Sequence, residues 1–255
     1  MILFAKYHGA GNDFILIDDQ SETFPVSNHN FIQSVCQRQT GIGADGLILL
    51  QKSEKADARA RFFNSDGKEV ALCGNGLRCL VDFAYQLERI GAKSTLETND
   101  RLVACEWNDG EITVDIGPYT WLHPLSFESL DIQVVNTGVP HAVAFVEDHT
   151  QFSMAPQIRS HASLGMEGAN VNFAVLTDNK LHVRTYERGV EGETQACGTG
   201  AAAVAVAAQK KYHLPNPITI VPRSGEELKV DVSPASLRLT GKATFVFHGS
   251  FQSAN

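Results

Sequence analysis

The amino-acid sequence predicts a mixed α/β fold of the α+β kind. We expect two pseudo-symmetric domains, each a mostly antiparallel sheet rolled around a central helix, with an active site in the cleft between them. Short runs rich in Val, Ile and Phe, bounded by Gly, Pro, Asn or Asp, recur along the 255 residues and are typical of strands. Helical patterns are few. A Cys-Gly-x-Gly turn followed by an apolar stretch occurs twice, at Cys73 and at Cys197.

Further landmarks repeat in the same order as the two cysteine turns. The segment YHGAGNDFILIDD from Tyr7 matches NTGVPHAVAFVED from Asn136, and RFFNSDG from Arg61 matches RTYERG from Arg184. Such self-similarity is the signature of a repeated architecture. Gly and two prolines in GPYTWLHP (117–124) interrupt the strand pattern and predict a boundary there. We therefore expect a first domain that ends near residue 117 and a second domain that comprises 118–239.

The expected elements are many short strands and three helices. The helices lie near 28–39, after Cys73 and after Cys197. The Ala- and Val-rich stretch after Gly200 has no polar face, so that helix should be buried all round. In the helix after Cys73, helical spacing predicts a buried face made of Leu77, Leu80, Val81, Ala84 and Leu87. The strands are expected at 14–18, 46–50, 60–64, 111–116, 142–146, 171–176, 181–186, 218–221, 227–232 and 243–247.

Composition limits the classes of function. The net charge of −8 argues against nucleic acid or an anionic membrane as the main partner and is compatible with a small-molecule substrate. No apolar run approaches the roughly 20 residues that span a bilayer, and MILFAKYHG is too short and too early charged for a secretion signal. Five cysteines without a C-x-x-C pair indicate reduced thiols in a cytoplasmic protein. Three of them are expected to be small buried apolar side chains: Cys36, Cys79 and Cys105.

A cysteine directly before an apolar helix has a chemical consequence. The first N–H groups of a helix carry partial positive charge, which lowers the pKa of a thiol from its ordinary value of about 8.5. The glycines after Cys73 and Cys197 let the backbone approach an anion closely. Two such sulfurs on opposite sides of one cleft suit inversion at a carbon next to a carboxylate. One sulfur removes the proton, the other returns one, and the N–H groups stabilise the planar anion between these steps.

The motifs around these residues resemble those of the diaminopimelate epimerase family, in order and over the whole chain. They are HGAGNDF (8–14), GIGADG (41–46), FNSDGKEVALCGNGLRC (63–79), GVPHAV (138–143), YERGVEGETQACGTG (186–200) and TGKATFVFHG (240–249). The resemblance implies an isomerase that converts LL-diaminopimelate to meso-diaminopimelate in lysine and peptidoglycan precursor biosynthesis, with no metal and no pyridoxal phosphate or other cofactor. It also implies that the C-terminal strand returns to the first domain, which then comprises 1–117 plus 240–255.

The resemblance implies roles residue by residue. Cys73 and Cys197 are the implied acid/base pair, and His141 and Glu187 the side chains that assist the thiols. The implied substrate contacts are Asn12, Asn64, Asn172, Glu187 and Arg188 around the distal amino-acid end, and the turn residues Gly74, Asn75, Gly198 and Thr199 around the reacting carboxylate. Taken as residues alone, the three asparagines outside the turns equally suit turns and strand ends, and His141 suits a structural role.

Three positions depart from the commoner family pattern. Val139 stands where many members have Asn, Gly46 where some have Gln, and Glu191 is one extra residue between Glu187 and Cys197. Without an amide at position 139, the site lacks a potential hydrogen-bond partner for the distal end of the substrate. The loss of such a partner reduces selectivity by about 10² or more. We therefore expect a looser choice of substrate that extends to simpler acidic amino acids.

Other interpretations fit parts of the pattern. Another cofactor-independent racemase, acting on proline, hydroxyproline or an acidic amino acid, also has paired Cys-Gly-x-Gly turns, but polar residues suited to an open-chain diamino acid weigh against it. A phenazine-type isomerase shares the architecture but lacks the thiol pair. A thiol redox sensor or small-acid binding protein would not exchange the α-proton. GIGADG precedes a strand, so it does not predict a dinucleotide site. The sequence leaves the oligomeric state open, and a homodimer is compatible with it.

Overall fold

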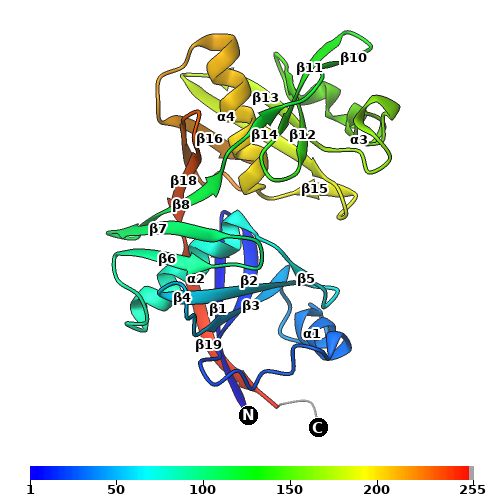
Figure 1. The fold of residues 1–255 in the computed structure, drawn as a ribbon. Helices are drawn as coiled ribbons and strands as arrows, with labels where there is room; N and C mark the ends of the chain where they lie inside the picture. Colours follow the sequence, from blue (N-terminus) through cyan, green and yellow to red (C-terminus); the bar gives the residue numbers. More distant parts are fainter. Residues whose placement is uncertain (253–255) are drawn as a thin grey trace. The chain divides into compact units, whose positions relative to one another are not determined.

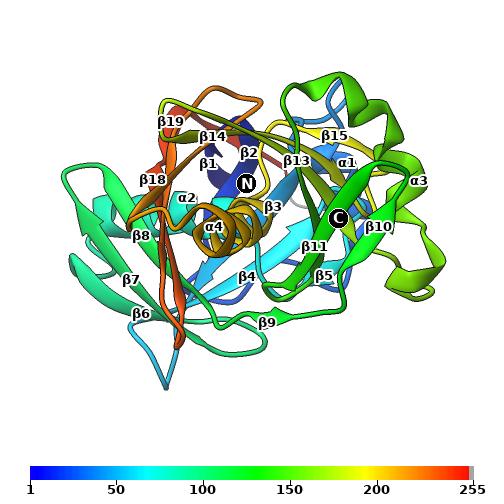
Figure 2. The ribbon, with the colours of Figure 1, turned by 90° about the horizontal axis from the view of Figure 1, so that it is seen from above.

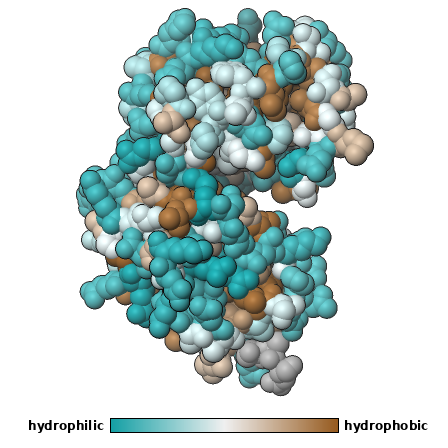
Figure 3. All heavy atoms as spheres, viewed as in Figure 1, coloured by the Kyte–Doolittle hydropathy of each residue, from teal (hydrophilic) through white to brown (hydrophobic). Residues whose placement is uncertain are grey.

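The chain, described over residues 1–252 in a computed structural model, has the predicted mixed α+β architecture (Figure 1). It divides into two compact units. Unit 1 comprises Met1–Val114 and the C-terminal segment that starts at Gly241, and unit 2 comprises Asp115–Thr240. No helix in the described part of the chain is long and apolar enough to cross a membrane. The face drawn in Figure 3 is mostly hydrophilic, with apolar residues in small separate patches.

Unit 1 packs one sheet against helix α2 (Gly74–Gln86). Its strand order is β19-β1-β2-β3-β4-β6-β7-β8, with β5 beside β4, and neighbours are antiparallel except in the pairs β2–β3 and β4–β6. The shorter helix α1 (His29–Cys36) begins after the Asn28 cap. The strands are β1 (Ile2–Gly9), β2 (Asn12–Asp18), β3 (Gly46–Gln51), β4 (Ala58–Asn64), β5 (Glu69–Val70), β6 (Lys93–Glu97), β7 (Leu102–Asn108), β8 (Glu111–Gly117) and β19 (Thr244–Phe251).

Unit 2 packs its sheet against helix α4 (Gly198–Tyr212), which Figure 2 shows end-on. The strand order is β11-β12-β13-β14-β16-β17-β18, with β9 and β10 beside β11 and β15 beside β14. Helix α3 (Ala155–Arg159) contacts β13. The strands are β9 (Thr120–Trp121), β10 (Leu125–Phe127), β11 (Leu130–Asn136), β12 (Pro140–Phe145), β13 (Asn170–Thr177), β14 (Lys180–Glu187), β15 (Gly192–Thr194), β16 (Ile218–Pro222), β17 (Leu228–Val232) and β18 (Leu237–Lys242).

The two units repeat one topology, which confirms the pseudo-symmetry predicted from the sequence. In unit 2 the parallel pairs are β12–β13 and β14–β16, at the same places in the strand order as β2–β3 and β4–β6 in unit 1. An ion pair is repeated with them. The Arg61 guanidinium donates two hydrogen bonds to Glu69, at 2.7 and 2.8 Å, and Arg184 donates to Glu193 at the same two distances. Both arginines lie in the repeated segments RFFNSDG and RTYERG.

The two central helices are buried in different ways. In α4, every residue from Ala201 to Ala208 is at most 2% exposed, as the absence of a polar face predicts. In α2, the predicted face is buried at Leu77, Leu80, Val81 and Ala84, but Leu87 is 39% exposed, so the prediction is wrong at that residue. The reason is that α2 ends at Gln86 and Leu87 is already its C-cap, where the helical spacing no longer applies.

Several strands were not predicted from the sequence because polar residues interrupt their apolar pattern. In β1, Lys6 lies in the middle of the strand, yet it is only 7% exposed because it forms an ion pair with Asp13 at 2.7 Å. In β11, Asp131 and Gln133 alternate with buried apolar residues, a pattern typical of a strand with one buried face. Cys36, Cys79 and Cys105 are buried as predicted.

Candidate active site

Cys197 is the N-cap of α4, and its sulfur caps the helix. The backbone of Cys197 is extended, its carbonyl accepts the first helical bond from Ala201, and its Sγ accepts a hydrogen bond from the Gly200 N–H at 3.4 Å. The Thr199 hydroxyl lies 3.5 Å from the same sulfur. A half-buried sulfur at this place receives donors from the helix terminus, which stabilise a thiolate.

His141, at the start of β12, is connected to this sulfur through Thr199. Its Nε2 lies 3.0 Å from the Thr199 hydroxyl and its Nδ1 lies 3.1 Å from the Asn172 amide nitrogen. Burial, with a smaller contribution from the charge of Arg188, lowers the pKa of His141 to about 3. The ring is therefore neutral at neutral pH and carries one proton.

The position of that proton follows from the neighbours of Asn172. The amide oxygen of Asn172 accepts a hydrogen bond from the Thr185 hydroxyl at 2.9 Å, and its NH₂ group donates to the Ala142 carbonyl at 3.3 Å. The NH₂ group therefore also faces Nδ1 of His141, which must accept. The proton lies on Nε2 and is donated to Thr199, whose own hydroxyl proton is then available to Cys197.

Asn172, an expected substrate contact, lies in the interior of unit 2. Its side chain is fully buried, and both its oxygen and its nitrogen are engaged inside unit 2. Asn170, two residues earlier on the same strand, is 5% exposed and accepts a hydrogen bond from the Arg188 N–H at 2.8 Å. Asn170 was not predicted as a site residue, although its spacing of two residues from Asn172 places the two side chains on one face of β13.

Cys73 is the N-cap of α2 but, unlike Cys197, makes no side-chain capping bond. Its thiol is half-buried and points to the Asn12 amide oxygen, at 3.7 Å. The Asn75 amide donates to the same oxygen at 3.3 Å and accepts in turn from the buried Arg78 at 3.1 Å. The structure thus brings together three predicted site residues of unit 1: Asn12, Cys73 and Asn75.

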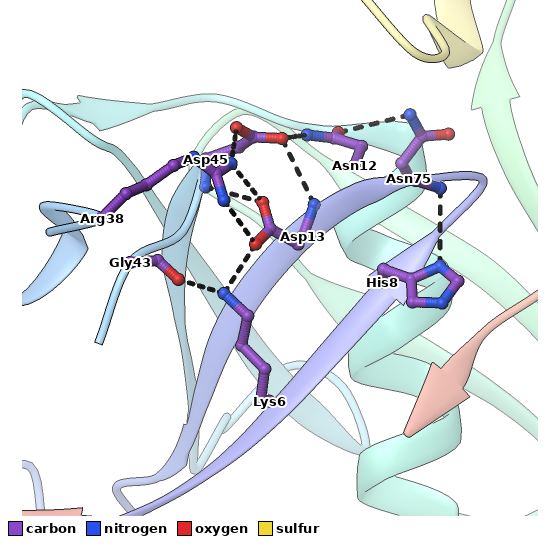
Figure 4. A network of polar contacts seen from close by, with 9 residues as sticks. Lys6, His8, Asn12, Asp13, Arg38, Gly43, Asp45 and Asn75 are labelled. Atoms are coloured by element: carbon purple, nitrogen blue, oxygen red, sulfur yellow. Dashed lines mark hydrogen bonds and ion pairs between the residues drawn. The ribbon is translucent and has the colours of Figure 1, made fainter. Parts of the chain in front are cut away.

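A charged network behind Asn12 holds it in place (Figure 4). The Asn12 amide nitrogen donates to Asp45 at 2.7 Å, and Arg38 bridges Asp45 and Asp13. Lys6 contacts Asp13 and the Gly43 carbonyl. Burial would raise the pKa of Asp13, but hydrogen bonds from Arg38 and Lys6 and their positive charge lower it to about 2. No local sequence pattern predicted this network. The one sequence feature that pointed to Asp45 is its place in the motif GIGADG, directly before a buried strand.

The remaining predicted residues lie near the same helix termini or at strand ends. Asn64 ends β4, is exposed, and forms a turn in which its backbone pairs with Lys68 and Gly67. Glu187 ends β14, and Arg188 forms an ion pair with Glu167 at 2.9 Å. Glu191 adopts a positive φ of 53° and binds Arg159 at 2.7 Å. The turn residues open α2 and α4: Gly74 and Asn75 in unit 1, Gly198 and Thr199 in unit 2.

No metal-binding group is formed by these residues. Among residues 1–252, no three or more His, Cys, Asp or Glu side chains gather as ligands of a metal would. The polar groups around the thiols are amides, hydroxyls and helix N–H groups. Such groups can donate to a carboxylate and stabilise its anionic forms without a metal.

Solved structures of isomerases and racemases share this fold. A phenazine biosynthesis protein of the PhzF family from Bacillus anthracis superposes with a TM-score of 0.79 at 15% identity, covering 97% of this chain and 98% of its own. A probable proline racemase from Agrobacterium radiobacter gives 0.71 at 13% identity, covering 99% and 93%. These likenesses show the fold.

The family of the chain follows from the sequence comparison. The model of the diaminopimelate epimerase family matches residues 4–122 and 133–246. A diaminopimelate epimerase from Archaeoglobus fulgidus is 37% identical over 269 residues, covering 97% of this chain and 95% of its own. One from Flavobacterium psychrophilum is 39% identical over 256 residues, covering 95% and 97%. The chain belongs to the diaminopimelate epimerase family, as the resemblance of its motifs predicted.

Proposed function

We propose that the chain inverts the α-carbon of LL-diaminopimelate to give meso-diaminopimelate by a two-base thiol mechanism without a cofactor. The observation that carries this proposal is the pair of cysteines that cap the equivalent helices of two repeated units in a member of this family. We further propose that the two units are the expected domains, 1–117 plus 240–255 and 118–239, each of which supplies one thiol.

The chemistry requires the two thiols in opposite protonation states. The thiolate takes the α-proton from one face of the substrate carbon and becomes a thiol. The other thiol gives its proton to the opposite face and becomes a thiolate, so protons balance and the configuration inverts. Between these steps the charge spreads over the substrate carboxylate. N–H groups at the helix termini, around Gly74, Asn75, Gly198 and Thr199, stabilise that charge as it develops.

The remaining site residues have supporting roles in this proposal. Asn12 and His141 hold and orient the two sulfurs, because Asn12 contacts Cys73 and His141 is linked to Cys197 through Thr199. Asn12, Asn64, Asn172, Glu187 and Arg188 bind the distal amino-acid end of the substrate, and Glu187 also assists the thiols. Asn172 in addition orients His141, whose Nδ1 lies 3.1 Å from the Asn172 amide nitrogen.

Exchange of the α-proton in D₂O tests this function directly. Incubation with LL-diaminopimelate should incorporate one deuterium at the inverted α-carbon, measured by NMR or mass spectrometry. Cys73→Ala and Cys197→Ala should each abolish epimerisation with an unchanged circular dichroism spectrum. Either alanine variant with normal two-way turnover would contradict the assignment of that thiol. A binding protein or redox sensor would exchange no proton at all.

Two further properties complete the proposal. The location is cytoplasmic, because five free thiols are stable in a reducing compartment. The chain forms a homodimer through strands β1 and β19, which expose large apolar side chains: Leu3 (74%), Phe245 (44%), Val246 (50%) and Phe247 (44%). Contiguous exposed apolar residues of this size mark interaction surfaces. Light scattering should give twice the mass of 27.7 kDa for the wild type and the monomer mass for Val246→Lys.

A further inference from the structure

The two repeated units differ at three equivalent buried positions beneath their central helices. In unit 1, Ile48 on β3 lies between Leu16 on the parallel strand β2 and Phe62 on the antiparallel strand β4. In unit 2, Asn172 on β13 lies between Val143 on β12 and Thr185 on β14 in the same arrangement. Two residues before Leu16 and Val143 stand Phe14 and His141. Unit 1 therefore has Phe14, Ile48 and Phe62 where unit 2 has His141, Asn172 and Thr185.

The helix glycines confirm the equivalence. A Cβ atom added at Gly76, in the first turn of α2, would lie 2.8 Å from Ile48, and one added at Gly200, in the first turn of α4, would lie 2.5 Å from the Asn172 oxygen. All six side chains are at most 5% exposed. Unit 2 thus has three polar side chains where unit 1 has three apolar core side chains. Burial of a polar group lowers the stability of the fold unless the group is hydrogen-bonded.

The polar set gives the Cys197 sulfur hydrogen-bond donors. The Ala142 carbonyl, which can only accept, fixes the NH₂ end of the Asn172 amide, and Thr185 donates to its oxygen. Asn172 then fixes the proton of His141 on Nε2, and His141 donates to the Thr199 oxygen. The Thr199 hydroxyl, 3.5 Å from the sulfur, then donates to Cys197, beside the Gly200 N–H at 3.4 Å. Two donors at one sulfur favour its anionic form.

The Cys73 sulfur instead meets an acceptor. A carboxylate can only accept, so Asp45 fixes the NH₂ group of Asn12 toward itself, and the Asn12 oxygen faces Cys73. Arg38 holds Asp45 in that position through a 2.7 Å ion pair (Figure 4). An amide oxygen accepts from a thiol proton and repels a thiolate.

We propose that in the ligand-free protein Cys197 is the resting thiolate and Cys73 the resting thiol, and that the Thr185–Asn172–His141–Thr199 chain and the Arg38–Asp45–Asn12 chain set this difference. The inference rests on the proposed function only in taking both thiols as the acid/base pair. Asn172 and Thr185 are positioning residues, since they act on the sulfur through His141 and Thr199.

Charged groups near the two sulfurs also affect which protonation state each sulfur adopts. In unit 2, His141 is neutral and Arg188 acts on it at longer range. In unit 1, the buried Arg78 favours a thiolate at Cys73, although its guanidinium is engaged with the Gly74 carbonyl at 3.4 Å and the Asn75 oxygen at 3.1 Å. Behind Asn12 lie the charged side chains of Lys6, Asp13, Arg38 and Asp45.

Competitive alkylation of the full chain, without substrate, measures the difference in ionisation between Cys73 and Cys197. Iodoacetamide reacts with thiolates, and both thiols are half-buried, so mass spectrometry of the two cysteine peptides compares their ionisation. At pH 7 we expect Cys197 to react at least about tenfold faster than Cys73. At pH 10, where both ionise, the rates should converge. Equal rates at pH 7, a faster Cys73, or a ratio that persists at pH 10 would overturn the proposal.

Two variants with matched controls separate positioning from structure. Thr185→Val leaves the buried Asn172 oxygen without its donor, which loosens the contact of Asn172 with His141 and should slow Cys197 several-fold without changing Cys73. Thr185→Ser retains the hydroxyl and should keep the wild-type rate. Asp45→Asn lets Asn12 turn its NH₂ group to Cys73 and should accelerate Cys73 alone. Parallel changes at both sulfurs would contradict the proposal. If a variant fails to fold, the wild-type ratio still decides. Loss of deuterium exchange in the wild type would contradict the proposed function and leave this ratio unaffected.

Discussion

The imidazole Nε2 of His141 lies 3.0 Å from the Thr199 hydroxyl, which itself lies 3.5 Å from the Cys197 sulfur. Because the ring is buried and neutral, it contributes as a hydrogen-bond donor through Thr199 and not as a positive charge beside the sulfur. His141 thus orients the Thr199 hydroxyl toward the Cys197 sulfur.

Thr199→Val should remove the connection between His141 and Cys197. A hydrogen bond to a charged group contributes about 1.5–3 kcal/mol, so we expect kcat to fall by about 10- to 100-fold. The fold should be unchanged, because Val has the same shape as Thr. Steady-state kinetics with LL-diaminopimelate checks this, with Thr199→Ser as the control that keeps the hydroxyl. Equal losses in the Val and Ser variants would show that the methyl group, and not the hydrogen bond, matters.

Stability should fall as the pH drops below about 6.5. The pKa of His141 is lowered from 6.5 to about 3, so between these values the unfolded chain binds a proton that the folded chain does not. The free energy of unfolding then decreases by about 1.4 kcal/mol per pH unit, or about 2 kcal/mol between pH 6.5 and 5. Urea denaturation at several pH values measures this slope.

The histidine responsible for that slope can be identified by substitution. His141→Gln should flatten the dependence of the free energy of unfolding on pH, because Gln has no proton to gain in this range. His182→Gln, at an exposed position on β14, is the control for the replacement of a histidine by glutamine. An unchanged slope in the His141 variant would mean that another group causes it.

Gly200→Ala should damage both stability and activity. The added Cβ would lie 2.5 Å from the Asn172 oxygen, closer than atoms tolerate, so α4 must shift relative to β13. Overpacking of this kind costs about 1–3 kcal/mol, and it displaces the helix terminus that holds Cys197. Thermal unfolding and turnover are the measurements. Gly192→Ala, where the nearest atom is 4.0 Å away, should change neither by more than a small amount.

Substrate choice should be looser than in relatives that carry Asn at the position of Val139. Val139 lies half-buried between Gly138 and Pro140, where its side chain offers no hydrogen bond to a substrate. We expect measurable racemisation of L-glutamate or L-aspartate by the wild type. Val139→Asn should raise the preference for diaminopimelate by up to about 10² in the ratio of kcat/KM values. An active wild type that rejects both acidic amino acids would refute this.

Elements whose pattern lies in consecutive residues were predicted from the sequence, and elements that depend on distant residues were not. The strands at 46–50 and 171–176 and the helices after both cysteines were predicted because their apolar runs or small residues are contiguous. Strand β1 was not, because Lys6 interrupts its apolar run and is compatible with burial only through Asp13. The Lys6–Asp13 ion pair also depends on Arg38 and Asp45, which come from a different part of the chain.

The sequence by itself determined the repeat, the two cysteines before small-residue helices and, through its motifs, the family. Each of these features consists of consecutive residues, so it can be recognised without knowing which distant residues it contacts. Only the tertiary structure decided which way the amides of Asn12 and Asn172 point, because the Asp45 carboxylate and the Ala142 carbonyl orient them from other strands or loops. A side-chain amide is a donor at one end and an acceptor at the other. Its effect on a neighbouring sulfur therefore depends on long-range contacts that no local pattern contains.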